Sequence, residues 1–91
     1  MLNDATEMTT LNVSVPSKIF LVLRENETYL TSYMKRYAAL NLFQRHKLSI
    51  GQCAELADMT EEDFMFFLGE NKVSIFDYLD ETELKKELEN V

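Results

Sequence analysis

Residues 47–69 read KLSIGQCAELADMTEEDFMFFLG, and this stretch decides the fold. Ser49 and Thr60, two residues that favour the N-cap position of a helix, each precede a run with apolar residues at helical spacing. The apolar positions that share a face are Ile50, Cys53, Ala54 and Ala57 in the first run and Phe64, Phe67 and Leu68 in the second. The pattern predicts a helix-turn-helix hairpin over residues 48–69.

The ends of these two helices are also marked. Asp58 and Met59 are left for the turn, and Thr60 with Asp63 can form a pair similar to a capping box. Gly69 is the expected C-terminal stop, because glycine favours the position after the last helical residue. The lone Cys53 shares its face with two alanines, so we expect it to fill the core.

Composition limits the class of protein. The chain has 91 residues, 46% of them hydrophobic, which fits one small domain with a modest core, and a homodimer is the expected remedy for the small buried area. Two glycines and one proline argue against an all-β sandwich and favour a mainly α chain. One cysteine excludes an intramolecular disulfide, and the chain shows no signal-peptide pattern and no long apolar span. We therefore expect a soluble, cytoplasmic protein that does not bind membranes.

The first part of the chain carries one predicted strand. Residues 1–7 show no periodicity and are expected to form a disordered extension, whereas residues 10–15 alternate strictly. One side carries Leu11, Val13 and Val15, and the other carries Thr10, Asn12 and Ser14. A single strand cannot pair its own backbone groups, so we expect its partner to come from another copy of the chain, with the three apolar residues in the dimer interface.

A long helix follows. Pro16 ends the strand and a short helix runs through residues 19–23, after which Asn26 caps a helix predicted over 26–47. Three tyrosines lie at i, i+4 spacing on that helix, and they are assigned to the dimer interface, with stacking on nucleic-acid bases as the alternative: Tyr29, Tyr33 and Tyr37. The other face is basic and carries Lys35, Arg36, Arg45, His46 and Lys47.

The C-terminal part is acidic. A short extended segment over residues 73–77 and a last helix over 81–90, capped by Asp80, are predicted. Residues 1–50 hold six Lys or Arg against four Asp or Glu, whereas residues 51–91 hold three against twelve. A basic first half can approach phosphates, and the acidic segment 70–91 either is solvated or docks on a basic partner. The residues assigned to partner binding are Phe76, Tyr78, Leu79, Leu84 and Leu88.

The predicted organisation is therefore a mainly α chain with one N-terminal strand. Its parts are a dimerisation region over residues 8–47, the helix-turn-helix over 48–69 and the acidic segment over 70–91. No enzyme site is predicted, because the single histidine, His46, has no second histidine and no cysteine pair nearby for a metal, and no glycine-rich phosphate loop exists. No cofactor is expected.

The hairpin also carries a resemblance. The run from Leu40 to Leu68 resembles the small prokaryotic proteins called uncharacterised protein family 0175. In that family a basic helix end leads into a Leu-Ser-Leu/Ile-Gly turn, an Ala-Glu-Leu-Ala helix and a Met-Ser/Thr-x-x-x-Phe helix. The matching positions here are Leu42, Phe43, 47–51, 54–57, Met59, Thr60 and Phe64. The resemblance implies a helix-turn-helix protein that binds DNA and is often regarded as the predicted antitoxin of a toxin–antitoxin pair. The chain departs from the family pattern at residues 61–63, which are all acidic here.

The first half resembles a second group, the ribbon-helix-helix dimers, in which a two-stranded antiparallel ribbon lies in the major groove. In that arrangement the outward polar residues of the strand read base edges. Taken with the basic face and the hairpin, the candidate DNA-binding residues are Thr10, Asn12, Ser14, Lys18, Lys35, Arg36, Arg45, Lys47, Gln52 and Thr60.

Two functions remain open from the sequence. One is a dimeric DNA-binding regulator, an antitoxin that represses its own operon and also binds a cognate toxin or another basic protein. The other is a protein-interaction module whose acidic tail binds a partner and whose hairpin is only structural. The acidic residues 61–63 would repel phosphates at the start of the second hairpin helix, so DNA contact is expected from the first half instead.

Overall fold

The computed structural model describes residues 7–74. The predicted extension over residues 1–7, apart from Glu7, lies outside the described residues. So do the last three residues of the extended segment 73–77, the helix over 81–90 and all five residues assigned to partner binding. Within the described part, none of the helices is long and apolar enough to cross a membrane.

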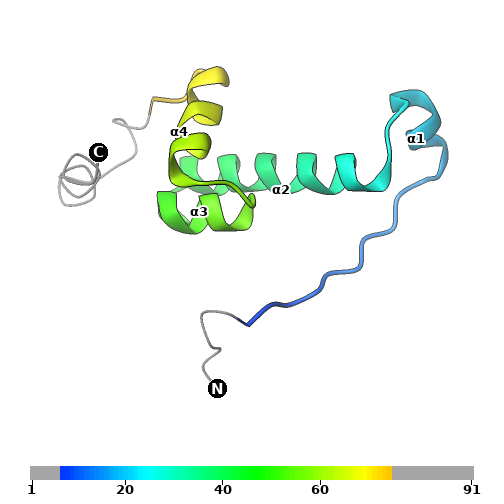
Figure 1. Cartoon of the computed structure of the whole chain (residues 1–91), viewed down its shortest axis with the longest axis horizontal. Coiled ribbons are helices and arrows are strands. Elements are labelled where there is room, and N and C mark those ends of the chain that lie inside the picture. The colour runs from blue at the N-terminus through cyan, green and yellow to red at the C-terminus, as the bar shows by residue number, and fades with distance from the viewer. Residues whose placement is uncertain (1–6, 75–91) are drawn as a thin grey trace.

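Four helices make up the described chain, in the order α1 (Lys18–Leu23), α2 (Glu27–Gln44), α3 (Ile50–Leu56) and α4 (Glu61–Glu70). Figure 1 shows α2 as the long axis of the molecule, with α3 and α4 packed at its C-terminal end and α1 at the opposite end. The segment before α1 runs out from the helices as an extended trace. The mainly α fold class is confirmed.

The core lies between the C-terminal half of α2 and the hairpin. Its largest fully buried side chains are Phe43, Phe64, Leu68 and Cys53. The rings of Phe43 and Phe64 meet edge to face, with centroids 6.3 Å apart, an arrangement that aromatic pairs favour. All seven residues predicted for the two hairpin faces are buried, so both faces are confirmed.

Side-chain caps begin three of the helices. The Asn26 Oδ1 accepts a hydrogen bond from the Tyr29 N–H (2.8 Å) at α2. At α3 the Ser49 Oγ accepts from the Gln52 N–H (3.2 Å), while the Gln52 Oε1 accepts from the Ser49 N–H (3.0 Å), which completes a capping box. At α4 the Thr60 Oγ1 accepts from the Asp63 N–H (3.1 Å). The caps predicted at Asn26, Ser49 and Thr60 are confirmed, and the cap predicted at Asp80 lies outside the described residues.

The predicted turn at Asp58 and Met59 after α3 is confirmed, but the ends of α2 and α4 differ from the prediction. After α2, α3 and α4 the chain turns at His46, Asp58 and Lys72, which have φ values of 58°, 57° and 61°. In each case the next residue donates its N–H to a carbonyl five residues back, as Lys47 does to Leu42 (2.9 Å), which is the Schellman arrangement. The prediction that α2 runs to Lys47 was therefore wrong by three residues. The Gly69 stop was also wrong, because α4 continues to Glu70 and turns at Lys72.

The predicted strand over residues 10–15 is not formed. Residues 7–16 have no regular secondary structure, and within the described chain no backbone hydrogen bond joins residues 8–15 to another residue. Leu11 is 80% exposed, so the segment is not half-buried either. The physical reason is that a strand needs a neighbouring strand, and the described part of one chain offers none.

Candidate nucleic-acid interface

The N-terminal segment alternates polar and apolar residues along its sequence. Thr10, Asn12 and Ser14 are exposed, and they alternate with Leu11 and Val13, which are exposed as well, the latter at 63%. The backbone N–H and C=O groups along this stretch meet no partner within the described chain. An exposed segment of this kind has the features of an unpaired edge strand that another strand can join.

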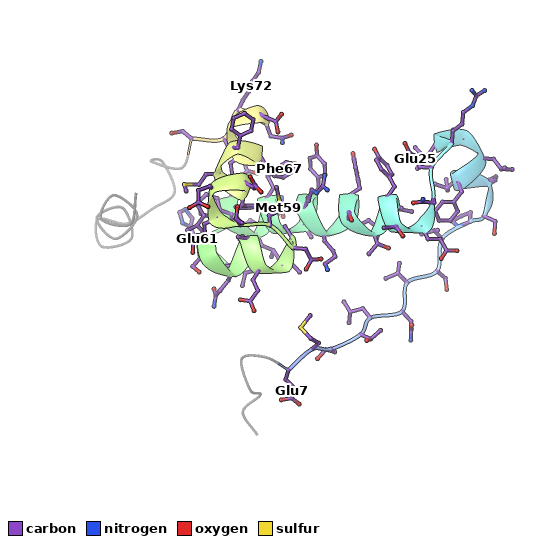
Figure 2. The ribbon with its side chains drawn as sticks, in the orientation of Figure 1. Glu7, Glu25, Met59, Glu61, Phe67 and Lys72 are labelled. Atoms are coloured by element: carbon purple, nitrogen blue, oxygen red, sulfur yellow. The ribbon has the colours of Figure 1, made fainter. Side chains whose placement is uncertain are left out.

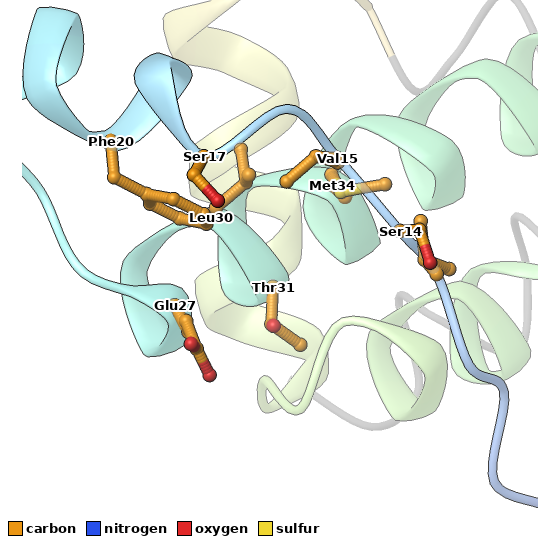
Figure 3. A pocket seen from close by; sticks show the side chains of 9 residues that line it. Ser14, Val15, Ser17, Phe20, Glu27, Leu30, Thr31 and Met34 are labelled. Atoms are coloured by element: carbon orange, nitrogen blue, oxygen red, sulfur yellow. The ribbon is translucent and has the colours of Figure 1, made fainter.

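A groove lies between this segment, α1 and the first half of α2. It has a volume of about 380 Å³ and is lined by Val13, Ser14, Val15, Ser17, Phe20, Glu27, Leu30, Thr31 and Met34. Figure 3 shows apolar side chains such as Phe20 and Leu30 around it beside polar ones such as Glu27 and Thr31, so its wall is mixed. On α1, Leu21 and Val22 are also about 80% exposed. So much uncovered apolar surface is typical of an interface.

The basic residues fall into separate groups. Lys18 begins α1, directly after the N-terminal segment. Arg45 and Lys47 lie in the connection between α2 and α3, at the opposite end of α2 from α1 (Figure 1). The predicted basic residues therefore do not form one continuous patch on a single chain.

Two of the predicted cations on α2 have specific surroundings. The Lys35 Nζ forms an ion pair with Asp58, which joins the middle of α2 to the turn between α3 and α4. Arg36 lines a second groove instead. Lys35 is thus held by a carboxylate, whereas Arg36 lies beside aromatic rings.

That second groove follows the predicted tyrosine stripe. Ring centroids are 6.1 Å apart for Tyr29 and Tyr33 and 4.6 Å apart for Tyr33 and Tyr37. Tyr37 also meets Phe67 of α4 edge to face at 5.2 Å, so the stripe continues onto the hairpin. All three tyrosines remain partly exposed, and their assignment to a dimer interface stays a prediction.

Two candidates in the hairpin have a structural role. The Gln52 amide oxygen is engaged by the Ser49 N–H, and the Thr60 hydroxyl by the Asp63 N–H. Thr60 caps the start of α4, and Gln52, in the first turn of α3, completes the capping box with Ser49. Within the described chain, helix capping therefore explains both residues, and a contact with DNA is not needed to explain them.

The first turn of α4 is acidic and exposed. Its first three residues are Glu61, Glu62 and Asp63. The Glu61 side chain lies against the first turn of α3, because a Cβ added at Gly51 would come within 2.9 Å of the Glu61 Oε1. Figure 2 shows Glu61 at this junction. A recognition helix normally brings its N-terminal residues to the DNA, where three carboxylates would meet phosphates.

The described residues also bear on metal binding. Across residues 7–74 no group of three or more side chains that could hold a metal ion is found.

Sequence reasoning missed one exposed aromatic residue. Phe66 lies on α4 and is 72% exposed, whereas its neighbours Phe64 and Phe67 are buried. At 100° per residue, a position two residues from Phe64 lies on the opposite side of the helix, so the spacing already indicated that Phe66 faces outward.

The comparisons with known proteins bear on the whole chain. No curated protein and no solved structure matches it. One family model does match, and it covers residues 8–91, which include the N-terminal segment, α1 and α2 as well as the hairpin that carried the resemblance. The chain therefore belongs to the Uncharacterised protein family (UPF0175).

Proposed function

We propose that this chain is a dimeric DNA-binding regulator that reads DNA through a two-stranded ribbon built from residues 10–15 of two copies. The observation that carries the proposal is the exposed N-terminal segment, whose sides alternate strictly between polar and apolar and whose backbone has no partner in the described chain. The antitoxin role, in which the regulator represses its own operon and also binds a protein partner, belongs to the same proposal.

Pairing of two copies would supply partners for the backbone of the segment and cover its apolar residues. An antiparallel ribbon joins the free N–H and C=O groups and turns Leu11, Val13 and Val15 toward the groove beside α1 and α2. The opposite side then presents Thr10, Asn12 and Ser14 in a row. A two-stranded ribbon fits the major groove, where an asparagine amide can make two hydrogen bonds to adenine and hydroxyls can contact any base.

The remaining cations supply phosphate contacts. Lys18 follows the ribbon directly at the start of α1, and Arg36, Arg45 and Lys47 are exposed. The hairpin supports this arrangement without reading DNA, because the first turn of α4 is acidic and the Gln52 and Thr60 side chains are engaged in caps. Binding through cations predicts a steep dependence of affinity on salt.

The first experiment is an electrophoretic mobility shift with the purified chain and the DNA upstream of its own gene. We expect a shift at low salt that weakens as salt rises, with a stronger shift than for scrambled DNA of equal length. If the upstream DNA behaves like the scrambled DNA at every salt concentration, the regulator proposal fails.

Two sets of variants locate the reading element. Asn12→Ala should reduce the preference for upstream over scrambled DNA by about tenfold, since a good bidentate base contact contributes roughly 1–3 kcal/mol. Asn41→Ala, at an exposed position on α2, is the matched control and should bind as the wild type does. The pair Glu61→Gln and Glu62→Gln should leave binding unchanged. If this pair strengthens binding instead, α4 faces the phosphates and the ribbon assignment is wrong.

A further inference from the structure

Beyond DNA binding, the outward face of α4 has two features that the described part of the chain, residues 7–74, does not explain. The first is Phe66, which leaves 72% of its surface in water. The second is Gly69, which lies one turn further along the same helix. We call Glu62, Phe66, Gly69 and Glu70 the outer α4 face, because their i, i+3 and i+4 spacings place them together, away from the buried Phe64, Phe67 and Leu68.

Gly69 is not required by the backbone. Its φ is not positive, and a Cβ built on it would meet nothing within 4 Å. Glycine inside a helix is less favourable than alanine, so Gly69 lowers the stability of α4. No contact within the described chain compensates for this loss. What glycine does offer here is a flat surface beside Phe66, onto which another backbone can pack closely.

Charge identifies the kind of surface that fits this face. Glu62 and Glu70 lie one turn before and one turn after Phe66, and both are exposed. From Leu48 to Asn71 the chain contains six carboxylates and neither lysine nor arginine. The nearest cation along the chain is Lys72, beyond the end of α4, and Lys35 is already paired with Asp58. An aromatic side chain between carboxylates suits an apolar recess rimmed by Arg or Lys.

We propose that the outer α4 face is a docking surface for a basic protein, with Phe66 as the apolar anchor, Gly69 as the point of close approach and the flanking carboxylates as the charge match. The mode is that of an amphipathic helix laid against a groove of the partner. The hairpin packs at the C-terminal end of α2, whereas residues 13–15 line a groove with its first half, so DNA and the basic protein would use different surfaces (Figure 1). The inference names a surface for the protein partner of the proposed function and rests on that part of it, whereas it does not depend on DNA binding.

The test uses two synthetic helical peptides as probes for the full chain. One carries leucines at i, i+4 spacing with Arg and Lys at the other positions, and the second keeps the leucines and replaces every Arg and Lys with Glu. Binding is followed by fluorescence anisotropy at a salt concentration of about 0.15 M, where exposed charges are partly screened. We expect the basic peptide to bind and the acidic peptide to fail.

Variants of the outer α4 face decide whether that binding is specific. Phe66→Ala keeps every charge and should weaken the basic peptide about tenfold, as loss of a central aromatic anchor does. Gly69→Ala should also weaken binding although it raises the melting temperature, a combination that a purely structural role of Gly69 would not produce. Glu70→Gln should weaken binding, whereas its matched control, Glu55→Gln on the exposed side of α3, should not.

Several results would overturn the proposal. Equal binding of the basic peptide by wild type, Phe66→Ala and Gly69→Ala would mean that only net charge attracts it. If Phe66→Ala converts a larger assembly into a smaller one, the outer α4 face binds a second copy of the chain. If Phe66→Ala frees a face that the chain's own C-terminal segment had covered, that segment binds there. The mobility shift with upstream DNA, measured in parallel on the same variants, is expected to be unchanged and separates these failures from a failure of DNA binding.

Discussion

At the scale of single residues, Cys53 shows how the core controls chemistry. Its side chain is 0% exposed, and burial raises the pKa of the thiol from 9.0 to about 11. The nucleophile is the thiolate, so a thiol that remains protonated and enclosed is protected from reagents. We expect an aromatic disulfide reagent at pH 8 to modify the folded chain only as fast as it unfolds, and urea to restore rapid modification. Rapid modification without urea would contradict the enclosed position.

The same shift gives a dependence of stability on pH. The thiol of the unfolded chain ionises near pH 9.0, while that of the folded chain stays protonated up to about pH 11. Unfolding therefore releases a proton between these values, so this residue's contribution to stability is present below pH 9 and falls as the pH rises toward 11. Urea unfolding at pH 8, 9, 10 and 11 should show a shallower fall for Cys53→Ala than for the wild type. Parallel curves would show that ionisation of Cys53 is not linked to folding.

Near the end of α4 a glycine occupies a helical position and a lysine occupies a left-handed one, which is the reverse of their backbone preferences. Gly69 lies inside the helix with open space at its Cβ, whereas Lys72 adopts a left-handed φ of 61°. Gly69→Ala should stabilise the chain by about 1 kcal/mol, and Lys72→Gly by roughly 0.5–1 kcal/mol, because each residue then suits its backbone. Thermal unfolding should show the melting temperature raised in both variants, and Glu70→Gly, at the last residue of α4, is the control that should lower it.

At the scale of elements, the N-terminal caps were predictable because they are local. Ser49, Thr60 and Asn26 each cap a backbone N–H three residues on, a distance that the sequence displays directly. The apolar faces of the hairpin follow from helical spacing in the same way. The C-terminal ends of α2 and α4 were predicted less well, because His46 and Lys72 occupy positions where glycine is usual, and after Lys72 it is burial of Val73 that favours the turn.

The capping box at α3 offers a direct test of an element. Ser49→Ala removes the acceptor for the Gln52 N–H, and we expect it to cost about 1 kcal/mol of stability and several degrees of melting temperature. Ser49→Asp keeps an acceptor at the same position and should remain near the wild type. If both variants lose the same stability, the cap does not contribute and packing of Ile50 and Cys53 alone holds the helix.

At the scale of the whole molecule, the contacts between residues far apart in the chain could not be predicted from the sequence. The Lys35–Asp58 ion pair and the Tyr37–Phe67 ring contact connect α2 to the hairpin over more than twenty residues, and no local pattern encodes either one. The candidate DNA-binding residues illustrate the same limit. Their types and spacing suggested one basic side, whereas the fold separates Lys18 from Arg45 and Lys47 along α2 and gives Gln52 and Thr60 to caps.

The N-terminal segment is where the single chain and the proposed assembly differ most. Periodicity predicted two sides for this segment, but no strand forms because the described chain contains nothing with which it can pair. If two copies supply the pairing, the chain should elute as a dimer whose melting temperature rises with protein concentration, as mass action requires. Light scattering coupled to gel filtration measures the mass directly, and a monomer at high concentration would remove the basis for the ribbon.

Charges placed on opposite sides of the same segment can separate dimerisation from reading of DNA. Leu11→Asp with Val13→Asp puts two carboxylates on the side that would be buried, and because unpaired charges are costly to bury, we expect a monomer that no longer shifts DNA. Thr10→Asp with Asn12→Asp adds the same charge to the polar side, where it should leave the dimer intact and abolish only the shift through repulsion of phosphates. The two pairs add equal charge to the same stretch, so net charge cannot explain a difference between them. A dimer in both cases would place the dimer interface elsewhere, with the exposed tyrosines of α2 as the next surface to test.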